Sequence, residues 1–264
     1  MKFTKMQGLG NDYLYVYGIV PENIKELCIK FSDRHFGAGS DGMIYISPSE
    51  IADFKMRIFN ADGSEAKMCG NGIRCVGKYV YDKNYTRKTE ITVETLSGVK
   101  TLKLSVSDGK VTEATVDMGK AKTSDEKNIE IDGGLFSFVP VSVGNPHAVF
   151  FTDSIKEIEL EKIGPKIEHN RLFPDGVNAE FVQVLSPDKI QMRVWERGSG
   201  ITLACGTGSC ASVAACVKKG FCKAGEPVTV ILDGGELKIT VSDDFSVKMT
   251  GPAETVYEGE SVIC

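Results

Sequence analysis

A long internal repeat constrains the fold of this chain more than any other feature. The segment 193–210 aligns with the segment 57–74 without a gap, about 136 positions apart. In each copy a β-type apolar stretch leads through a glycine-containing loop to Cys-Gly-x-Gly, where a helical pattern begins. Each copy therefore places one thiol, Cys69 or Cys205, at a helix start. The arrangement suggests a symmetric site in which two cysteines face one substrate.

Shorter motifs recur in the same order on both sides of the chain. The matching pairs are Gly10-Asn11 with Gly144-Asn145, Asp41-Gly42 with Asp175-Gly176, and Val116–Gly119 with Lys248–Gly251. The sequence therefore predicts two pseudo-symmetric α+β domains, each a strand-rich, barrel-like sheet around a central helix. The first would comprise residues 1–117 plus 251–264 and the second residues 118–250, because the tail after Gly251 most economically pairs with the first domain.

The periodicity predicts four helices among mostly antiparallel strands. These helices are expected near 21–31, 70–82, 155–167 and 206–219. The last is apolar on most of its faces, so we expect the sheet to enclose it.

Composition excludes several classes of protein. The chain has 264 residues, 42% of them hydrophobic, which is enough for a sizeable core. A net charge of −5 gives no basic footprint for nucleic acid. No apolar run reaches the length of a membrane span, and the first residues do not resemble a signal peptide. We therefore expect a cytoplasmic protein without nucleic-acid or membrane partners.

The chain contains eight cysteines. None forms a Cys-x-x-Cys pair, and only three histidines are present, so neither a zinc site nor another metal centre is expected. A reducing cytoplasm also disfavours a disulfide framework. Cys28, Cys75, Cys210 and Cys216 lie in amphipathic helical patterns and are expected in the core.

A thiol at a helix start is suited to proton transfer. Unpaired N–H groups and the helix dipole lower its pKa, and the glycines that follow let backbone amides approach an anion closely. Two such helix starts could hold one α-carboxylate and place a thiol on each face of Cα. One thiolate would remove the α-proton while the other thiol delivers a proton from the opposite side. This is racemisation or epimerisation by two bases without a cofactor.

Several motifs together resemble those of bacterial diaminopimelate epimerase. They are Lys5–Asp12, Phe59–Glu65, Cys69–Arg74, Gly144–His147, Trp195–Gly200 and Ala204–Gly208. The resemblance runs in order from Phe3 to Tyr257. It implies two strand-rich barrels around helices, interconversion of L,L- and meso-diaminopimelate as a step toward lysine and peptidoglycan, no cofactor, and a homodimer.

The resemblance also implies roles for individual residues. Cys69 and Cys205 would be the acid–base pair, and His147 and Glu196 would adjust the pKa of the thiols. The substrate contacts would be Asn11, Asn60, Asn145, Asn178, Glu196 and Arg197, with backbone amides from Gly70, Asn71, Gly206 and Thr207 on the reacting carboxylate. Within this set Arg197 would hold the distal carboxylate through its planar fork.

Simpler interpretations exist for some of these residues. His147 could be a buried structural histidine, the asparagines could be turn residues, and Arg197 could be a solvated surface arginine. Some relatives carry Gln where this chain has Gly42, which leaves the breadth of substrates open.

Three other functions share parts of this pattern. A racemase of the proline racemase type also uses two cysteines, but it typically has His where Asn71 stands and needs no site for a distal carboxylate. A phenazine-biosynthesis-type isomerase or a small-molecule binding protein would not require both thiols. A redox-sensing dithiol would join Cys69 to Cys205 on oxidation.

Overall fold

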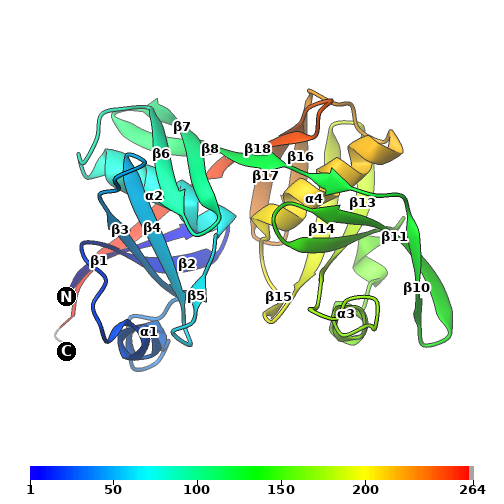
Figure 1. The fold of residues 1–264 in the computed structure, drawn as a ribbon, viewed down its shortest axis with the longest axis horizontal. Helices are drawn as coiled ribbons and strands as arrows, with labels where there is room; N and C mark the ends of the chain where they lie inside the picture. Colours follow the sequence, from blue (N-terminus) through cyan, green and yellow to red (C-terminus); the bar gives the residue numbers. More distant parts are fainter. Residues whose placement is uncertain (262–264) are drawn as a thin grey trace. The chain divides into compact units, whose positions relative to one another are not determined.

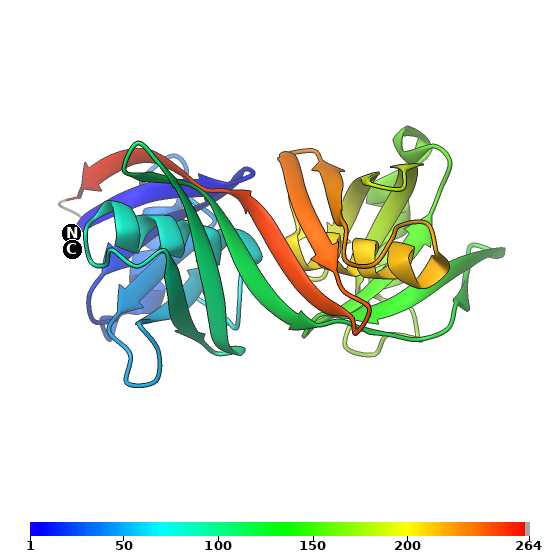
Figure 2. The same ribbon diagram turned by 90° about the horizontal axis from the view of Figure 1, so that it is seen from above.

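The computed structural model describes residues 1–261, so Cys264 and the end of the expected first domain lie outside it. The chain divides into two compact units, Met1–Asp117 with Thr250–Cys264, and Met118–Met249. It leaves the first unit within β8 (Lys110–Lys120) and returns within β18 (Ser246–Pro252) (Figures 1 and 2). The second crossing lies between 249 and 250, whereas the sequence places it between 250 and 251.

The first unit surrounds one long helix with strands. Its helices are α1 (Ile24–Ser32) and α2 (Gly70–Asp82). Its other strands are β1 (Lys2–Gly8), β2 (Asn11–Tyr17), β3 (Gly42–Ser47), β4 (Phe54–Asn60), β5 (Glu65–Ala66), β6 (Glu90–Thr95), β7 (Gly98–Ser107) and β19 (Glu254–Glu260). Helix α2 packs against β1, β2, β7 and β19.

The second unit has the same plan. Its helical segments are the 3-10 turn η1 (Ile155–Glu157), α3 (Leu160–Glu168) and α4 (Gly206–Lys219). Its strands are β9 (Lys122–Thr123), β10 (Lys127–Ile131), β11 (Gly134–Ser142), β12 (Pro146–Phe151), β13 (Asn178–Ser186), β14 (Lys189–Glu196), β15 (Gly200–Ile201), β16 (Pro227–Leu232) and β17 (Gly235–Val241).

Strand pairing repeats between the units in both order and direction. In the first unit β1–β2 is antiparallel, β2–β3 parallel, β3–β4 antiparallel, β4–β6 parallel and β6–β7 antiparallel. In the second unit β11–β12, β12–β13, β13–β14, β14–β16 and β16–β17 follow the same series. The internal repeat is therefore a repeat of topology.

Helix α4 is enclosed by the second unit, as its apolar sequence predicts. Cys210, Val213, Ala214 and Cys216 are fully buried, and the helix contacts β9, β11–β14, β16 and β17. Their small side chains let the surrounding strands come close to the helix axis. Cys28, Cys75, Cys210 and Cys216 all lie in the core, which confirms that prediction.

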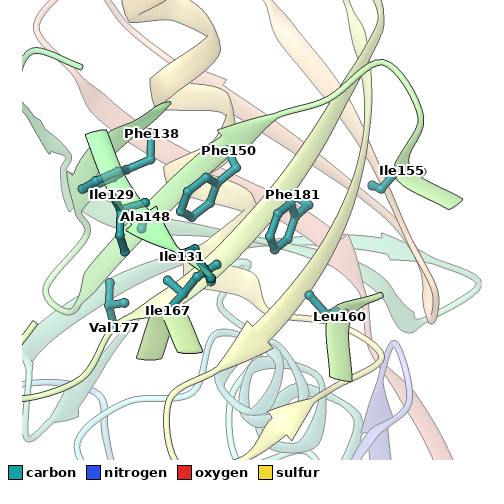
Figure 3. Packing of buried hydrophobic residues seen from close by; sticks show 11 residues of the cluster. Ile129, Ile131, Phe138, Ala148, Phe150, Ile155, Leu160, Ile167, Val177 and Phe181 are labelled. Carbon is teal, nitrogen blue, oxygen red and sulfur yellow. The ribbon is translucent and has the colours of Figure 1, made fainter. Parts of the chain in front are cut away.

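A separate cluster fills the space between α3 and the sheet of the second unit (Figure 3). The rings of Phe150 and Phe181 stack with their centroids 5.2 Å apart, and Phe138 lies 5.6 Å from Phe150. Ile167 and Leu160 of α3 belong to the same cluster. Burial of these apolar side chains fixes β12 and β13 as neighbours.

Two helix predictions are wrong in their bounds. The helix expected from Pro21 begins at Ile24, because residues 22 and 23 form a turn before it. The helix expected over 155–167 is interrupted at Ile158, whose extended backbone (ψ 112°) separates η1 from α3. The tail is as predicted, since β19 pairs antiparallel with β1. None of the helices in the described part of the chain is both long and apolar enough to cross a membrane.

Candidate active site

Cys69 is the N-cap residue of α2. Its extended backbone (φ −134°, ψ 116°) turns the sulfur back over the first turn of the helix, where Gly72 N–H donates to Sγ at 3.3 Å. The thiol itself donates to Asn11 Oδ1 at 3.2 Å. The sulfur therefore has one backbone donor, which favours a thiolate, and one oxygen acceptor, which favours the thiol.

A carboxylate behind Asn11 fixes the orientation of its amide. Asn11 Nδ2 donates to Asp41 Oδ2 at 2.7 Å, and Arg34 holds the other oxygen of Asp41 at 2.9 Å. Arg34 and Lys5 also bind Asp12. Although burial opposes it, the hydrogen bonds from Arg34 and Lys5 hold the pKa of Asp12 below its ordinary value. Asn11 is thus left with its carbonyl oxygen toward the thiol.

The remaining expected residues of the first unit lie at the start of α2 and at the end of β4. Gly70 and Asn71 open α2, and Arg74 donates to Asn71 Oδ1 at 3.0 Å. Asn60 ends β4 and donates to Ser64 Oγ at 3.0 Å. At Gly42 (φ +153°) a Cβ would lie 2.0 Å from the oxygen of Phe59, so this backbone leaves no room for the Gln of some relatives.

Cys205 occupies the same place in the second unit. It is the N-cap of α4 (φ −114°, ψ 110°), and Gly208 N–H donates to Sγ at 3.3 Å. The polar side chain beside this sulfur is Thr207, whose hydroxyl oxygen lies 3.6 Å away, whereas the one beside Cys69 is Asn11. Cys205 is also buried, with 5% of its surface exposed. The prediction that each repeat places a thiol at a helix start is confirmed for both cysteines.

A chain of polar side chains continues from Thr207 into the core. Asn145 Nδ2 donates to Thr207 Oγ1 at 3.3 Å, and Asn145 Oδ1 lies 3.0 Å from His147 Nε2. His147 Nδ1 lies 2.7 Å from Glu180 Oε1. His147 is therefore buried and hydrogen-bonded on both ring nitrogens, and it belongs to the chain of groups that ends at the thiol.

Two carboxylates influence the ionisation of Cys205. Burial, followed by the negative charges of Glu196 and Glu180, raises the pKa of the Cys205 thiol well above its usual value. The Thr207 hydroxyl and the Gly208 N–H oppose this rise. Burial also raises the pKa of Glu196, while hydrogen bonds with Thr202 and Cys205 oppose the change. The repeat partner of Glu196 is the uncharged Asn60, so the two repeats differ in charge at this position.

Arg197 and Asn178 form a separate group in the second unit. Asn178 accepts from Arg197 N–H at 3.1 Å and donates to the oxygen of Pro146 at 2.8 Å, so its side chain links two loops. The Arg197 side chain is exposed, with one guanidinium nitrogen 3.0 Å from the oxygen of Asp175. Glu168 anchors the same loop through Trp195 Nε1 at 2.7 Å and Gly198 N at 2.8 Å.

Sequence reasoning missed three carboxylates that organise these groups. They are Asp41 behind Asn11, Glu180 beside His147, and Glu168 under the loop of Arg197. Glu180 leaves a signal in the sequence, since it is a charged residue between the apolar Ala179 and Phe181 in a predicted strand. Within residues 1–261 no group of three or more His, Cys, Asp or Glu side chains could hold a metal ion.

The model of the family described as diaminopimelate epimerase matches residues 3–124 and 139–256 of this chain. The chain belongs to the diaminopimelate epimerase family. Similar proteins with that name come from Acetivibrio thermocellus (52% identical over 98% of both chains) and Methanococcus maripaludis strain C5 (52% identical over 98% of this chain and 99% of the relative). The relative from Desulfovibrio desulfuricans is 49% identical over 100% of this chain and 99% of its own.

Solved structures show that the diaminopimelate epimerase fold is shared more widely. A hydroxyproline epimerase from Agrobacterium vitis superposes with a TM-score of 0.78 at 16% identity, covering 99% of this chain and 90% of its own. A phenazine biosynthesis protein of the PhzF family from Bacillus anthracis gives 0.74 at 16% identity, covering 100% and 99%. Both alternatives from the sequence therefore share the fold, and the roughly half-identical relatives are what separate this chain from them.

Proposed function

We propose that this protein epimerises L,L-diaminopimelate to the meso form with two cysteines and no cofactor. The single observation that carries the proposal is the pair of equivalent helix starts, each capped by a thiol, in a chain about half identical to proteins named diaminopimelate epimerase. A helix start supplies both an anion site and a tuned thiol.

In the proposed reaction one cysteine acts as thiolate and the other as thiol. The thiolate takes the α-hydrogen as a proton, and the electron pair left on Cα delocalises into the α-carboxylate. The other thiol then gives its proton to the opposite face of Cα, so the two sulfurs exchange protonation states. Backbone amides of Gly70, Asn71, Gly206 and Thr207 would stabilise the charge on the carboxylate.

The two half-sites are suited to opposite protonation states because their surroundings differ. Cys69 is next to the uncharged Asn11, whereas Cys205 is next to Glu196 and to the chain that includes His147. Groups whose environments push their pKa values apart can serve as acid and base. We therefore assign to His147 and Glu196 the adjustment of thiol pKa.

We assign the recognition of the substrate to residues near the two helix starts. Asn11, Asn60, Asn145, Asn178 and Glu196 would contact its polar groups. Arg197 would bind the distal carboxylate, and the exposure of its side chain leaves donor groups free for this. A proline-type racemase would not need this arginine.

We further propose a homodimer that works in the cytoplasm. The family resemblance supports the dimer, and sedimentation velocity at micromolar concentration would test it. The chemistry supports a reducing compartment, because the reaction needs free thiols, and the seven cysteines within residues 1–261 are free.

Solvent exchange tests the proposed function directly. The reduced protein is incubated with L,L-diaminopimelate in deuterium oxide, with a chelator and no added cofactor. We expect deuterium at Cα together with growth of the meso form. Exchange only with proline or hydroxyproline would favour the racemase alternative, and no exchange with any amino acid would favour a binding or redox function.

A further inference from the structure

Glu180 is a fully buried carboxylate for which the mechanism above has no use. It lies in β13 with Oε1 2.7 Å from His147 Nδ1, and both side chains are inaccessible to solvent. Across the described residues its second oxygen, Oε2, has no hydrogen-bond partner. A buried carboxylate with one unsatisfied oxygen costs stability, so packing alone does not account for it.

The repeat shows what the fold needs at this position. Glu180 pairs with Val194, and in the first unit Ile44 pairs with Ile58, the repeat partner of Val194. A Cβ at Gly208 would lie 2.8 Å from Glu180 Oε1, and a Cβ at its repeat partner Gly72 would lie 2.8 Å from Ile44 Cδ1. The same place beneath the helix start thus holds an aliphatic side chain in one unit and a carboxylate in the other.

The partner of Glu180 differs between the units in the same way. The register of β12 with β13 and of β2 with β3 makes Tyr13 the counterpart of His147. The first unit therefore has Tyr13 and Ile44 where the second has a titratable pair. The repeat partner of this pair has no carboxylate, so the fold does not require one at this position.

The hydrogen bonds around Cys205 fix the orientation of its polar neighbours. Asn145 uses its NH2 group on Thr207, so its carbonyl oxygen faces His147 Nε2 and can only accept. His147 is therefore held between two oxygens, with Nε2 3.0 Å from Asn145 Oδ1 and Nδ1 2.7 Å from Glu180 Oε1. Thr207 accepts from Asn145, which leaves the hydroxyl hydrogen of Thr207 free to point at Cys205 Sγ.

We propose that Glu180 is a positioning residue for Cys205, which holds His147 against Asn145 and opposes ionisation of the Cys205 thiol. The proposal rests on the function proposed above for the two cysteines. Glu180 acts through His147 and through its charge, and it does not touch the substrate.

The carboxylate of Glu180 lies close enough to the Cys205 thiol for its charge to act on the sulfur directly. The position of a Cβ on Gly208 lies 2.8 Å from Glu180 Oε1 and 3.2 Å from Cys205 Sγ, so both atoms border the same small space. The charged groups that act on Cys205 within its own unit are Glu196 from β14 and Glu180 from β13. His147 from β12 contacts Glu180 on its other side. Removal of the Glu180 charge is therefore expected to make the thiolate of Cys205 easier to form.

The test measures each thiol separately, without substrate. Wild type and Glu180→Gln are alkylated with a small reagent across a pH series, and mass spectrometry quantifies modification at Cys205 and at Cys69. We expect the midpoint for Cys205 to fall by about one pH unit and the midpoint for Cys69 to stay in place. Turnover should fall through kcat, with little change in KM.

A matched control removes a different buried carboxylate from the same unit. Glu168→Gln loses the charge that anchors Trp195 and Gly198, and it should leave the Cys205 midpoint unchanged. If Glu180→Gln does not fold, the double variant His147→Tyr/Glu180→Ile, which copies the side chains of the first unit, is measured instead. We expect the alkylation midpoint of Cys205 to fall by the same amount in this double variant.

The outcomes separate this proposal from the proposed function. The role of Glu180 is overturned if Glu180→Gln leaves the alkylation midpoint of Cys205 unchanged or shifts the midpoint of Cys69 equally. It is also overturned if Glu168→Gln shifts the Cys205 midpoint by the same amount. If wild type fails to exchange the α-hydrogen of diaminopimelate, the proposed function fails, and the alkylation series still decides whether Glu180 controls Cys205.

Discussion

Asn11 turns its carbonyl oxygen toward Cys69 and accepts a hydrogen bond from the thiol at 3.2 Å. Its repeat partner Asn145 has the opposite polarity, because its NH2 group faces Thr207 beside Cys205. Asp41 fixes the first amide and His147 the second. The duplicated backbone therefore presents an acceptor to one sulfur and a donor network to the other.

Removal of the Asn11 acceptor should ease ionisation of Cys69. In Asn11→Leu the thiol loses the oxygen that stabilises its protonated form, so its pKa should fall, on the order of one unit or less. Alkylation of Cys69 against pH measures this. The midpoint for Cys205 in the same samples is the internal control, and a rise in the Cys69 midpoint would contradict the assignment.

Each cysteine should be required for turnover, and the losses should not add. A serine hydroxyl is a far weaker acid than a thiol, so Cys69→Ser and Cys205→Ser should each lower kcat by about a thousandfold or more. The double variant should be about as inactive as either single one, because the two groups act as a unit. Formation of meso-diaminopimelate measures all three.

Cys28→Ala is the control for loss of a buried thiol. Cys28 is packed in α1, so this change should lower the free energy of unfolding by about 1 kcal/mol and leave turnover intact. Retention of full epimerisation by either serine variant would refute the two-base mechanism.

The ion pairs of Asp12 should make part of the stability depend on pH. The folded pKa of Asp12 lies below its ordinary value of 3.8, so its contribution is present above that pH and is lost as the pH falls through the folded pKa. Arg34→Gln weakens this effect. The difference in Tm between wild type and Arg34→Gln should be largest near neutral pH. It should disappear below about pH 4.

An exposed arginine of the second unit provides the comparison. Arg171→Gln should change Tm by a similar small amount at every pH in the series. If the Tm difference between wild type and Arg34→Gln grows as the pH falls, the direction of the pKa shift assigned to Asp12 is wrong.

Crowding at Gly42 should exclude the glutamine that some relatives carry there. Gly42→Gln forces a Cβ toward the oxygen of Phe59, which should cost about 2 kcal/mol or more of unfolding free energy. Gly98→Gln is the matched control, because its φ is also positive (+95°) but no atom lies within 4 Å of its Cβ position. Chemical denaturation of both variants separates crowding from backbone strain, and equal losses would show that crowding adds nothing.

The sequence predicts well what depends on neighbouring residues. Cys-Gly-x-Gly before an apolar run is a local signal, and both thiols cap their helices as expected. The break at Ile158 was missed because Ile155, Ile158 and Ile163 keep a helical spacing across it. Apolar spacing reports which side chains are buried, and it does not report a single extended residue.

The part of the site that escaped prediction depends on pairing between distant strands. Glu180 meets His147 only because β12 and β13 lie parallel in one register, although the two positions are 33 residues apart in the sequence. Asp41 reaches Asn11 across a similar separation. The chemistry of a carboxylate is visible in the sequence, but its partner is fixed by the fold.

The pairing of β19 with β1 determines the order in which the protein can be completed during synthesis. All of the second unit, Met118–Met249, is synthesised before Glu254–Glu260 is made. Until then β1 has an open edge toward its later partner, and open edges invite wrong pairings. The amino-terminal unit is therefore the last to complete its sheet. We expect chaperones that bind nascent chains to encounter this unit before β19 has been added.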